Sequence, residues 1–461
     1  MKHKFYILIS AGLIFVSLQS CFVAKDYNQP DFSSLSEDLY HTDMLPQDSL
    51  SMAQLSWKEL FTDPILASHI ENALTNNLDI RIAIERVNVA NSYYLQGKTG
   101  YLPSVNAYAG VGYQRNFGDS PSDVTQYELI GNLSWEADVW GKIRSSKRAS
   151  ESAYLQTVAG HQAVKSQLVA QIATLYYQLL ALDEQLKIAE ETIGNRTNSL
   201  QTTQALKEAG QLTEVAVKQT EAQLKNVEGI RLDILREIRL VENTFSVLLG
   251  SSPKNIERGV LENQEITSEL KIGYPLQLLS NRPDVTAAEY GLIYAFEMTN
   301  VARSQFYPSL TLTATGGLQS LEFDDLFSAN SLFANILGRL TQPIFNKRQI
   351  KMQYEVAQAQ QEEAYYEFKR SVLMASKEVS DALYSIEIAN QKVQTKTEEY
   401  NAYNQAMIYS EELINSGFGS YLEVLTARES TLNAQISLAL LKFEKLRATV
   451  DLYRALGGGW N

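Results

Sequence analysis

The sequence is poor in several residue types, and each shortage excludes a class of structure. Cys21 is the only cysteine, which excludes an intrachain disulfide and a cysteine-ligated metal site. Only 10 prolines and 24 glycines occur in 461 residues, so long uninterrupted stretches are left that suit long helices. No run of 18 apolar residues follows the N-terminus, and no transmembrane helix is predicted. The net charge of -13 lacks the basic surface that nucleic acid binding requires.

The sequence also lacks the patterns that carry chemistry. The three consecutive glycines 457–459 have no lysine beside them, as a phosphate-binding loop would need, and no nucleophile elbow is present. The histidines are isolated and are more typical of exposed positions than of ligands; they are His3, His41, His69 and His161. We therefore expect no enzyme, no cofactor and no metal site.

The N-terminus has the pattern of an export signal. A basic start and a 14-residue apolar run from Phe5 to Leu18 are too short to span a bilayer and predict a signal peptide over residues 1–20. Leu18-Gln19-Ser20-Cys21 resembles a bacterial lipobox, in which the cysteine becomes the lipidated first residue. Gln19 departs from the usual small residue, and the alternative is a plain signal peptide with an incidental cysteine. Residues 21–55 show no periodicity and predict an extended arm.

Most of the mature chain is a duplication. "LPSVNAYAGVG" begins at Leu102 and "YPSLTLTATGG" at Tyr307, so Pro103 aligns with Pro308 at an offset of 205 residues. Further on, Gly210 aligns with Gly417 at an offset of 207. Because repeated sequence predicts a repeated structural unit, we expect a first repeat, a linker and a second repeat, which are residues 56–250, 251–274 and 275–461.

Each repeat predicts two strands followed by two long helices. Apolar and polar residues alternate over residues 127–139, which is long for a soluble strand and fits a strand that crosses a membrane. The acids Glu128, Glu136 and Asp138 share one face, expected to line a lumen and favour cations. A soluble antiparallel sandwich is the alternative. The predicted strands are 103–115, 127–140, 308–319 and 332–342, and the predicted helices are 143–206, 212–249, 347–414 and 418–456.

The predicted fold is therefore mainly α with a membrane β-barrel. A helix over residues 143–206 would be about 95 Å long. The last helix shows a coiled-coil seam with spacings of three and four, which consists of Leu422, Leu425, Glu429, Leu432, Ile436, Ala439, Phe443, Leu446, Val450 and Tyr453. Four strands cannot close a barrel, and open edges are not tolerated in lipid. Two copies would give a filled eight-stranded barrel and three a twelve-stranded barrel with a bore, so we expect a homotrimeric tunnel.

Motifs along almost the whole mature chain add a family resemblance. They are "DYNQP", "WKELFTDPIL", "ALTNNLDIRIA", "LSWEADVWGKIR", "NRPDVTAAEYGL", "ARSQFYPSLTLTATGG", "SGFGSYLEVLTARE" and "ALGGGW". Together they resemble the TolC-like outer-membrane efflux proteins, in the lipoprotein branch that serves resistance-nodulation-division pumps. The resemblance implies a lipid-anchored outer-membrane trimer that passes drugs or other small molecules outward, with a periplasmic adaptor and an inner-membrane transporter as partners. The alternatives are a duct for type I protein secretion or metal efflux, and a non-conducting periplasmic scaffold lipoprotein.

The resemblance also implies functional positions. The two glycine turns would contact the adaptor through Lys207, Glu208, Gly210, Gln211, Asn415, Ser416, Gly417 and Phe418. Leu422 matches an apolar constriction of the tunnel, whereas Thr426 stands where an acid is common. Glu423, Arg428 and Glu429 are expected to hold the closed state through ion pairs or hydrogen bonds between helices.

Overall fold

The computed structural model describes residues 23–30, 55–117, 122–264 and 281–460. The predicted signal peptide, Cys21, and parts of the predicted arm and linker lie outside these residues. The chain forms two compact units, and each unit takes segments from both repeats. The strand unit contains residues 86–158 and 287–370 with the N-terminal segment 23–30, and the helix unit contains the other described residues. Among the described helices, none is both long and apolar enough to cross a membrane.

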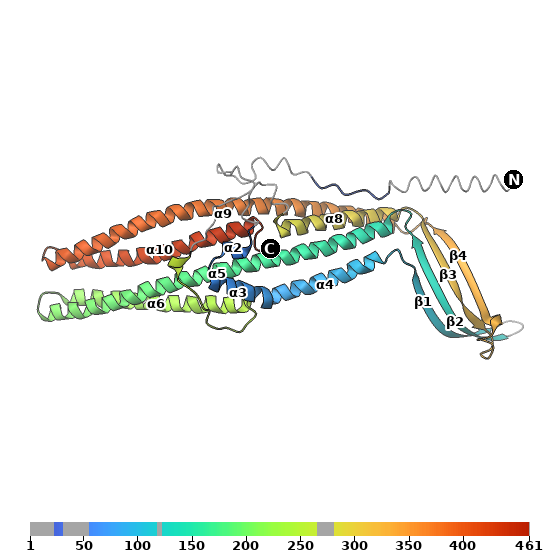
Figure 1. Cartoon of the computed structure of the whole chain (residues 1–461), viewed down its shortest axis with the longest axis horizontal. Coiled ribbons are helices and arrows are strands. Elements are labelled where there is room, and N and C mark those ends of the chain that lie inside the picture. Colours follow the sequence, from blue (N-terminus) through green and yellow to red (C-terminus); the bar gives the residue numbers. More distant parts are fainter. Residues whose placement is uncertain (1–22, 31–54, 118–121, 265–280, 461) are drawn as a thin grey trace. The chain divides into compact units, whose positions relative to one another are not determined.

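The strand unit carries one antiparallel sheet whose strand order follows the chain (Figure 1). Its strands are β1 (Ser104–Asn116), β2 (Ser122–Ala137), β3 (Ser309–Ser320) and β4 (Leu332–Thr341). All four predicted strands are confirmed, but the predicted bounds of β2 were wrong. The strand ends before Asp138, whose carboxylate accepts hydrogen bonds from the backbone amides of Ile143 and Arg144 at 2.9 and 3.0 Å. Asp138 therefore satisfies two unpaired N–H groups at the start of the next helix rather than continuing the strand.

Parts of four helices complete the strand unit, and they are α4 (Leu78–Lys98), α5 (Lys142–Glu208), α8 (Pro283–Ser304) and α9 (Gln349–Asn415). The N-terminal segment lies along α8. The side-chain amide of Asn300 accepts from the Lys25 amide at 3.1 Å and donates to the Lys25 carbonyl at 2.9 Å, and Arg303 donates to the Val23 carbonyl at 3.2 Å. Asn300 thus pairs with a backbone residue as a neighbouring strand would.

The helix unit consists mainly of two antiparallel helical hairpins, whose turns lie at the same end of the unit (Figure 1). The first joins α5 to α6 (Glu214–Leu248), and the second joins α9 to α10 (Tyr421–Ala455). The short helices α2 (Trp57–Leu60) and α3 (Pro64–Asn76) precede α4. Asp63 caps α3 by accepting from Ile65 N at 2.8 Å, and it also accepts from the Tyr176 hydroxyl at 2.6 Å.

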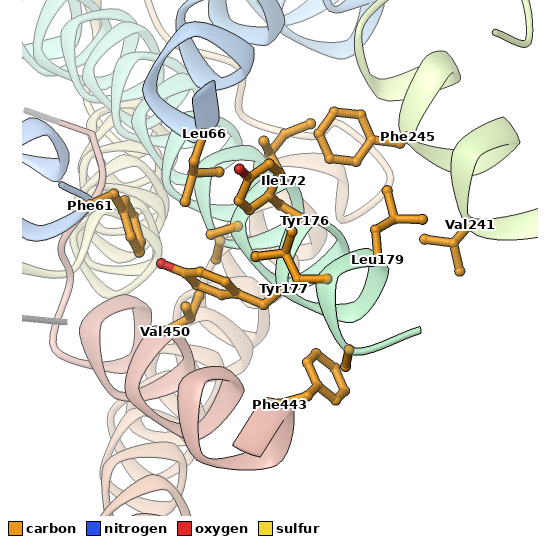
Figure 2. Close-up of a cluster of buried hydrophobic side chains, with 14 of the residues drawn as sticks. Phe61, Leu66, Ile172, Tyr176, Tyr177, Leu179, Val241, Phe245, Phe443 and Val450 are labelled. Atoms are coloured by element: carbon orange, nitrogen blue, oxygen red, sulfur yellow. The ribbon is translucent and has the colours of Figure 1, made fainter. Parts of the chain in front are cut away.

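One apolar core holds the helix unit together (Figure 2). Side chains from α3, α5, α6 and α10 meet there, including Leu66, Ile172, Tyr176, Phe245 and Val450, none of which is more than 1 % exposed. Full burial of a side chain of this size contributes about 2–3 kcal/mol. The seam predicted for α10 supplies Phe443, Val450 and Tyr453 to this core.

The duplication extends to individual contacts in the helix unit. Asn77 donates to the carbonyl of Leu248 at 2.9 Å, and Arg282, which is 205 residues later, donates to the carbonyl of Ala455 at 2.9 Å. The glycine after each returning helix also lies against the same segment: a Cβ on Gly250 would be 2.4 Å from the Asn76 carbonyl, and one on Gly457 would be 2.4 Å from the Asn281 carbonyl. Both glycines have positive φ, so neither position accepts a side chain. The two repeats therefore fold as the same unit.

Candidate functional site

Both hairpin turns have the same backbone design. Gly210 and Gly417 adopt φ values of 75° and 79°, which is the left-handed conformation that glycine accepts readily. The amide of Gln211 donates to the carbonyl of Leu206 at 2.9 Å, and the amide of Phe418 donates to the carbonyl of Leu413 at 3.0 Å. This is the Schellman ending of a helix, in which glycine reverses the chain at low cost. Phe418 is 85 % exposed, so the second turn presents an aromatic ring to the solvent.

A hydroxyl cluster links the second hairpin to the first just behind the turns. The hydroxyl of Tyr421, the first residue of α10, lies 2.9 Å from Thr203 Oγ1 on α5 and 2.6 Å from Thr220 Oγ1 on α6. Both threonines are only 2 % exposed. The three hydroxyl groups can form one series of hydrogen bonds, each using its single proton. Thr203 donates to Tyr421, Tyr421 donates to Thr220, and Thr220 donates to the Ala216 carbonyl at 2.9 Å.

Arg428 forms a second link, two turns further along α10. Its guanidinium donates to Glu411 Oε1 on α9 at 2.8 Å and to Ser199 Oγ on α5 at 2.7 Å. The inter-helix bonding predicted for Arg428 is therefore present. Together with Tyr421, this residue ties the two hairpins to each other near their turns.

A buried arginine lies beside these links. Arg196 on α5 is 4 % exposed and donates to Gln223 Oε1 on α6 at 2.8 Å. Burial lowers its pKa, which the nearby Glu429 opposes and Arg428 reinforces. Glu429 thus stabilises the positive charge of Arg196 from an exposed position on α10.

The space between the hairpins is a cavity of about 560 Å³. Thr203, Tyr421 and Arg428 line it, together with Leu206, Gln211 and Ile414 from the turn regions. The two links therefore cross a groove that opens beside the turns, and anything that enters this groove competes with them.

The other predicted constriction residues have different surroundings. Leu422 is 60 % exposed, as an apolar side chain must be if it contacts another chain or a lumen. Glu423 was expected to bond between helices, but in the single chain it bonds its own N-terminus, where Ser420 N donates to it at 3.4 Å in a capping box. Thr426 donates to the carbonyl of Leu422 at 2.9 Å, within its own helix.

Sequence reasoning missed the partners of Tyr421 and Arg428. Thr203, Thr220 and Ser199 are ordinary helix-surface residues in the sequence, and no local pattern marks their contacts with positions about 200 residues away. Glu411 is 17 residues from Arg428, on the other helix of the same hairpin. The available signal was Tyr421 itself, an aromatic residue shortly after a glycine turn.

The sheet has two faces of opposite character. Residues paired across strands share a face, so the register groups them without ambiguity. One face carries apolar rows such as Val105, Leu133, Ala314 and Ile336. The other carries polar rows such as Asn106, Asn132, Thr315 and Asn335, in which Thr315 donates to Asn132 at 2.5 Å. The outer strands β1 and β4 each have only one neighbour in the described sheet.

The three acids predicted to line a lumen do not behave alike. Glu128 and Glu136 lie on the polar face of β2, and Glu136 accepts from Lys142 at 3.0 Å. Asp138 lies beyond the strand and is occupied as the cap of α5, with its side chain 7 % exposed. Of the three, only Glu128 has no ion pair in the described structure, and it leans over Gly110, where a Cβ would be 3.0 Å from its carboxylate. No group of His, Cys, Asp and Glu among the described residues could hold a metal ion.

This architecture defines a class of protein, in which a sheet with an apolar and a polar face is combined with two long helical hairpins. The family model for outer membrane efflux proteins matches residues 69–251 and 275–458. The chain therefore belongs to the outer membrane efflux protein family. The two matched segments correspond to the two repeats.

Named relatives match the chain over nearly its whole length. It is 27 % identical to a probable outer membrane lipoprotein, SilC of Salmonella typhimurium, over 98 % of both chains. It is also 27 % identical to the toluene efflux pump outer membrane protein TtgI of Pseudomonas putida, over 96 % of both chains. A solved structure of CusC superimposes with a TM-score of 0.85 at 26 % identity, covering 95 % of this chain and 99 % of that one. The predicted family and fold class are confirmed.

Proposed function

We propose that this protein is the outer-membrane exit channel of a tripartite efflux pump. The observation that carries the proposal is the four-stranded sheet with one apolar face, one polar face and two unpaired edges, in a chain that belongs to the efflux protein family. An apolar face suits lipid, and a polar face suits a water-filled bore. Nothing in this arrangement requires a chemical step.

Closure of the sheet requires other copies of the chain. Unpaired backbone N–H and C=O groups cost several kcal/mol each in a lipid environment, so β1 of one chain must pair with β4 of another. Two chains would make eight strands, whose interior is filled by side chains. Three chains make twelve strands and leave a bore, which supports a homotrimer.

The turn end of the helix unit is the proposed gate. Tyr421 and Arg428 hold the second hairpin against the first, and this arrangement corresponds to the closed state. An adaptor protein that binds the exposed turns at residues 207–211 and 415–418 would favour a second helix packing in which these links are broken. In this proposal the energy comes from an inner-membrane transporter, and the channel is passive.

The N-terminal segment supports a lipid anchor on the strand unit. Val23 is only 3 % exposed, and the Asn300 pairing with Lys25 fixes the backbone two residues further on. Cys21 is two residues before Val23 in the sequence, so an acyl chain on Cys21 would be attached next to the segment that is held against α8. The anchor and the sheet would then enter the same membrane.

The cargo that we propose is a drug or another small organic molecule, in line with the name of TtgI. Metal efflux remains a second candidate, since the "Cation efflux system protein CusC" of Escherichia coli is also 27 % identical. The two candidates share the channel and differ only in what it passes.

Two measurements test the channel. Purified protein in micelles should run as a trimer by light scattering. In planar lipid bilayers it should conduct ions in rare openings, which become frequent when the links at Tyr421 and Arg428 are removed. The variant Cys21→Ser should still require detergent for extraction, because the sheet would hold it in the membrane. A monomer that becomes soluble after this substitution would contradict the proposal and favour a periplasmic scaffold.

A further inference from the structure

One row of the polar face is not polar. Tyr108 pairs with Ile130, Ile130 with Gly317, and Gly317 with Phe333, so these residues form a continuous row across all four strands. We call it the aromatic row. It lies between the row of Asn106, Asn132, Thr315 and Asn335 and the row of Gly110, Glu128 and Gln319.

Burial shows that the aromatic row is packed. Ile130 is 6 % exposed and is the only buried residue among those of the four strands, all of which the structure describes. Phe333 is half-buried, whereas the other residues of β4 are exposed, with Ile336 at 73 %. Ile130 and Phe333 are therefore shielded within the single chain, whereas Tyr108, on the outer strand β1, is 45 % exposed.

Gly317 makes this packing possible. A Cβ at this position would come within 2.1 Å of the Leu129 carbonyl, so no side chain can be placed there. The position between Ile130 and Phe333 is consequently open, and the two large side chains on either side of it can close over the gap. An alanine would displace β2 as well as fill this space.

We propose that the aromatic row forms an outer constriction of the bore, separate from the gate at the helix turns, and that it selects for apolar organic cations. The proposal rests on the proposed trimer. Three chains bring three copies of this row around the bore. Because paired residues run perpendicular to strands tilted by about 40°, the level of the three tyrosines and the level of the three phenylalanines lie about 9 Å apart along the barrel axis. Aromatic faces attract cations as well as apolar groups. Glu128 lies two residues further along β2, about 7 Å away, where a positive charge would be stabilised.

The expected width of the barrel is small enough for the aromatic side chains to narrow the bore. Twelve strands spaced about 4.8 Å apart and tilted about 40° enclose a backbone cylinder about 24 Å wide. At each of these two levels, three aromatic side chains projecting about 6 Å narrow the central passage to about 12 Å. The neighbouring row of asparagine and threonine side chains leaves more room.

The first experiment measures conductance where the helix gate does not limit it. Tyr108→Ser and Phe333→Ser are introduced together into a Tyr421→Phe background, and single-channel currents are recorded in potassium chloride. We expect about a twofold rise in conductance over the background, as the narrowest width grows. Tyr113→Ser, on the opposite face of β1, is the matched control and should change nothing. Equal currents in the double variant and its background would overturn the constriction.

The second experiment tests which way the row points. Cys21 is the only native cysteine, so Phe333→Cys and Tyr113→Cys in a background with Cys21→Ser and Tyr421→Phe each offer a single thiol. A water-soluble cationic methanethiosulfonate should block current through Phe333→Cys and leave Tyr113→Cys unaffected. The opposite pattern would place the row against lipid and refute the proposal.

The third experiment tests selectivity with two probes. Tetraphenylphosphonium should block the Tyr421→Phe channel at a concentration at least tenfold lower than in the variant that also carries Tyr108→Ser and Phe333→Ser. Tetramethylammonium, which has the charge without the apolar surface, should show no such difference. Equal block by tetraphenylphosphonium in both channels would refute the selectivity. Absence of channels from every variant and from the parent would instead contradict the proposed function itself.

Discussion

Replacing Tyr421 with phenylalanine is the sharpest test of the proposed gate, because it removes one oxygen atom and leaves the packing of the ring unchanged. That oxygen makes both hydroxyl contacts between α10 and the first hairpin, at 2.9 and 2.6 Å. Thr203 and Thr220 can still donate to the carbonyls of Ser199 and Ala216 at 2.7 and 2.9 Å. No buried donor is therefore left unsatisfied, and the cost is confined to the lost links.

The magnitude follows from the number of bonds. The three hydroxyl protons make three hydrogen bonds in the parent and two in the variant, where the proton of Thr203 returns to the Ser199 carbonyl. One hydrogen bond contributes about 1 kcal/mol net, so the substitution weakens the closed state by about 1 kcal/mol per chain. This corresponds to about a 5-fold shift of the closed-to-open equilibrium in each chain. If three chains open together, the total is about 3 kcal/mol. The parent channel should be nearly silent, and Tyr421→Phe should spend a large fraction of time open.

Single-channel recording in planar bilayers measures this shift as open probability. The matched control is Tyr409→Phe, which removes a hydroxyl from a tyrosine that is 58 % exposed on α9. Adding Arg428→Gln to Tyr421→Phe should raise the open probability further, since the bond from Arg428 to Ser199 on the first hairpin is lost as well. An open probability for Tyr421→Phe no higher than that for Tyr409→Phe would refute the argument that these hydroxyl contacts hold the gate.

Three further predictions concern stability and anchoring. Gly457→Ala should prevent assembly, because its Cβ would clash with a backbone carbonyl. Gly417→Ala meets open space and should cost only about 1–2 kcal/mol of backbone strain. Trimer yield and apparent Tm distinguish the two variants. Burial alone would raise the pKa of Asp63, but the hydrogen bonds that its carboxylate accepts lower the pKa overall. The ionised carboxylate therefore stabilises the fold at pH values above its ordinary pKa of about 3.9. This contribution to stability is lost as the pH falls below that pKa. Asp63→Asn should accordingly lower the apparent Tm by about 3 °C at pH 7 and reduce its fall below pH 4, and an unchanged pH profile would contradict this. Asn300→Ala should make the chain cleavable by trypsin after Lys25, and equal protection in the parent and the variant, measured by mass spectrometry, would show that the pairing does not hold the segment.

The overall fold was predictable because its signals are periodic and repeated. Alternation marked the strands, the absence of proline and glycine marked the long helices, and the offset of about 205 residues allowed each half to support the other. The bounds of β2 were not predictable, because Asp138 continues the alternation in sequence. Only the geometry shows that its carboxylate is used to cap α5.

The candidate site was predictable in its location and not in its contacts. The glycine turns and Arg428 were found because backbone requirements and charges are visible in a sequence. The hydroxyl links of Tyr421 were not found, since threonines facing a tyrosine on another hairpin leave no local trace. The aromatic row was missed for a related reason: Tyr108, Ile130 and Phe333 become one feature only when the strand register is known.

The duplicated design has a consequence for how the two hairpins divided their roles. The positions 207 residues before Tyr421 and Arg428 are Glu214 and Glu221, which make only exposed ion pairs with Lys207 and Lys218 on their own hairpin. After the duplication, only the second hairpin kept or acquired the side chains that bond to the other hairpin. A mutation that made the first hairpin resemble the second, such as Glu214→Tyr, would add a further contact between hairpins and make the channel harder to open.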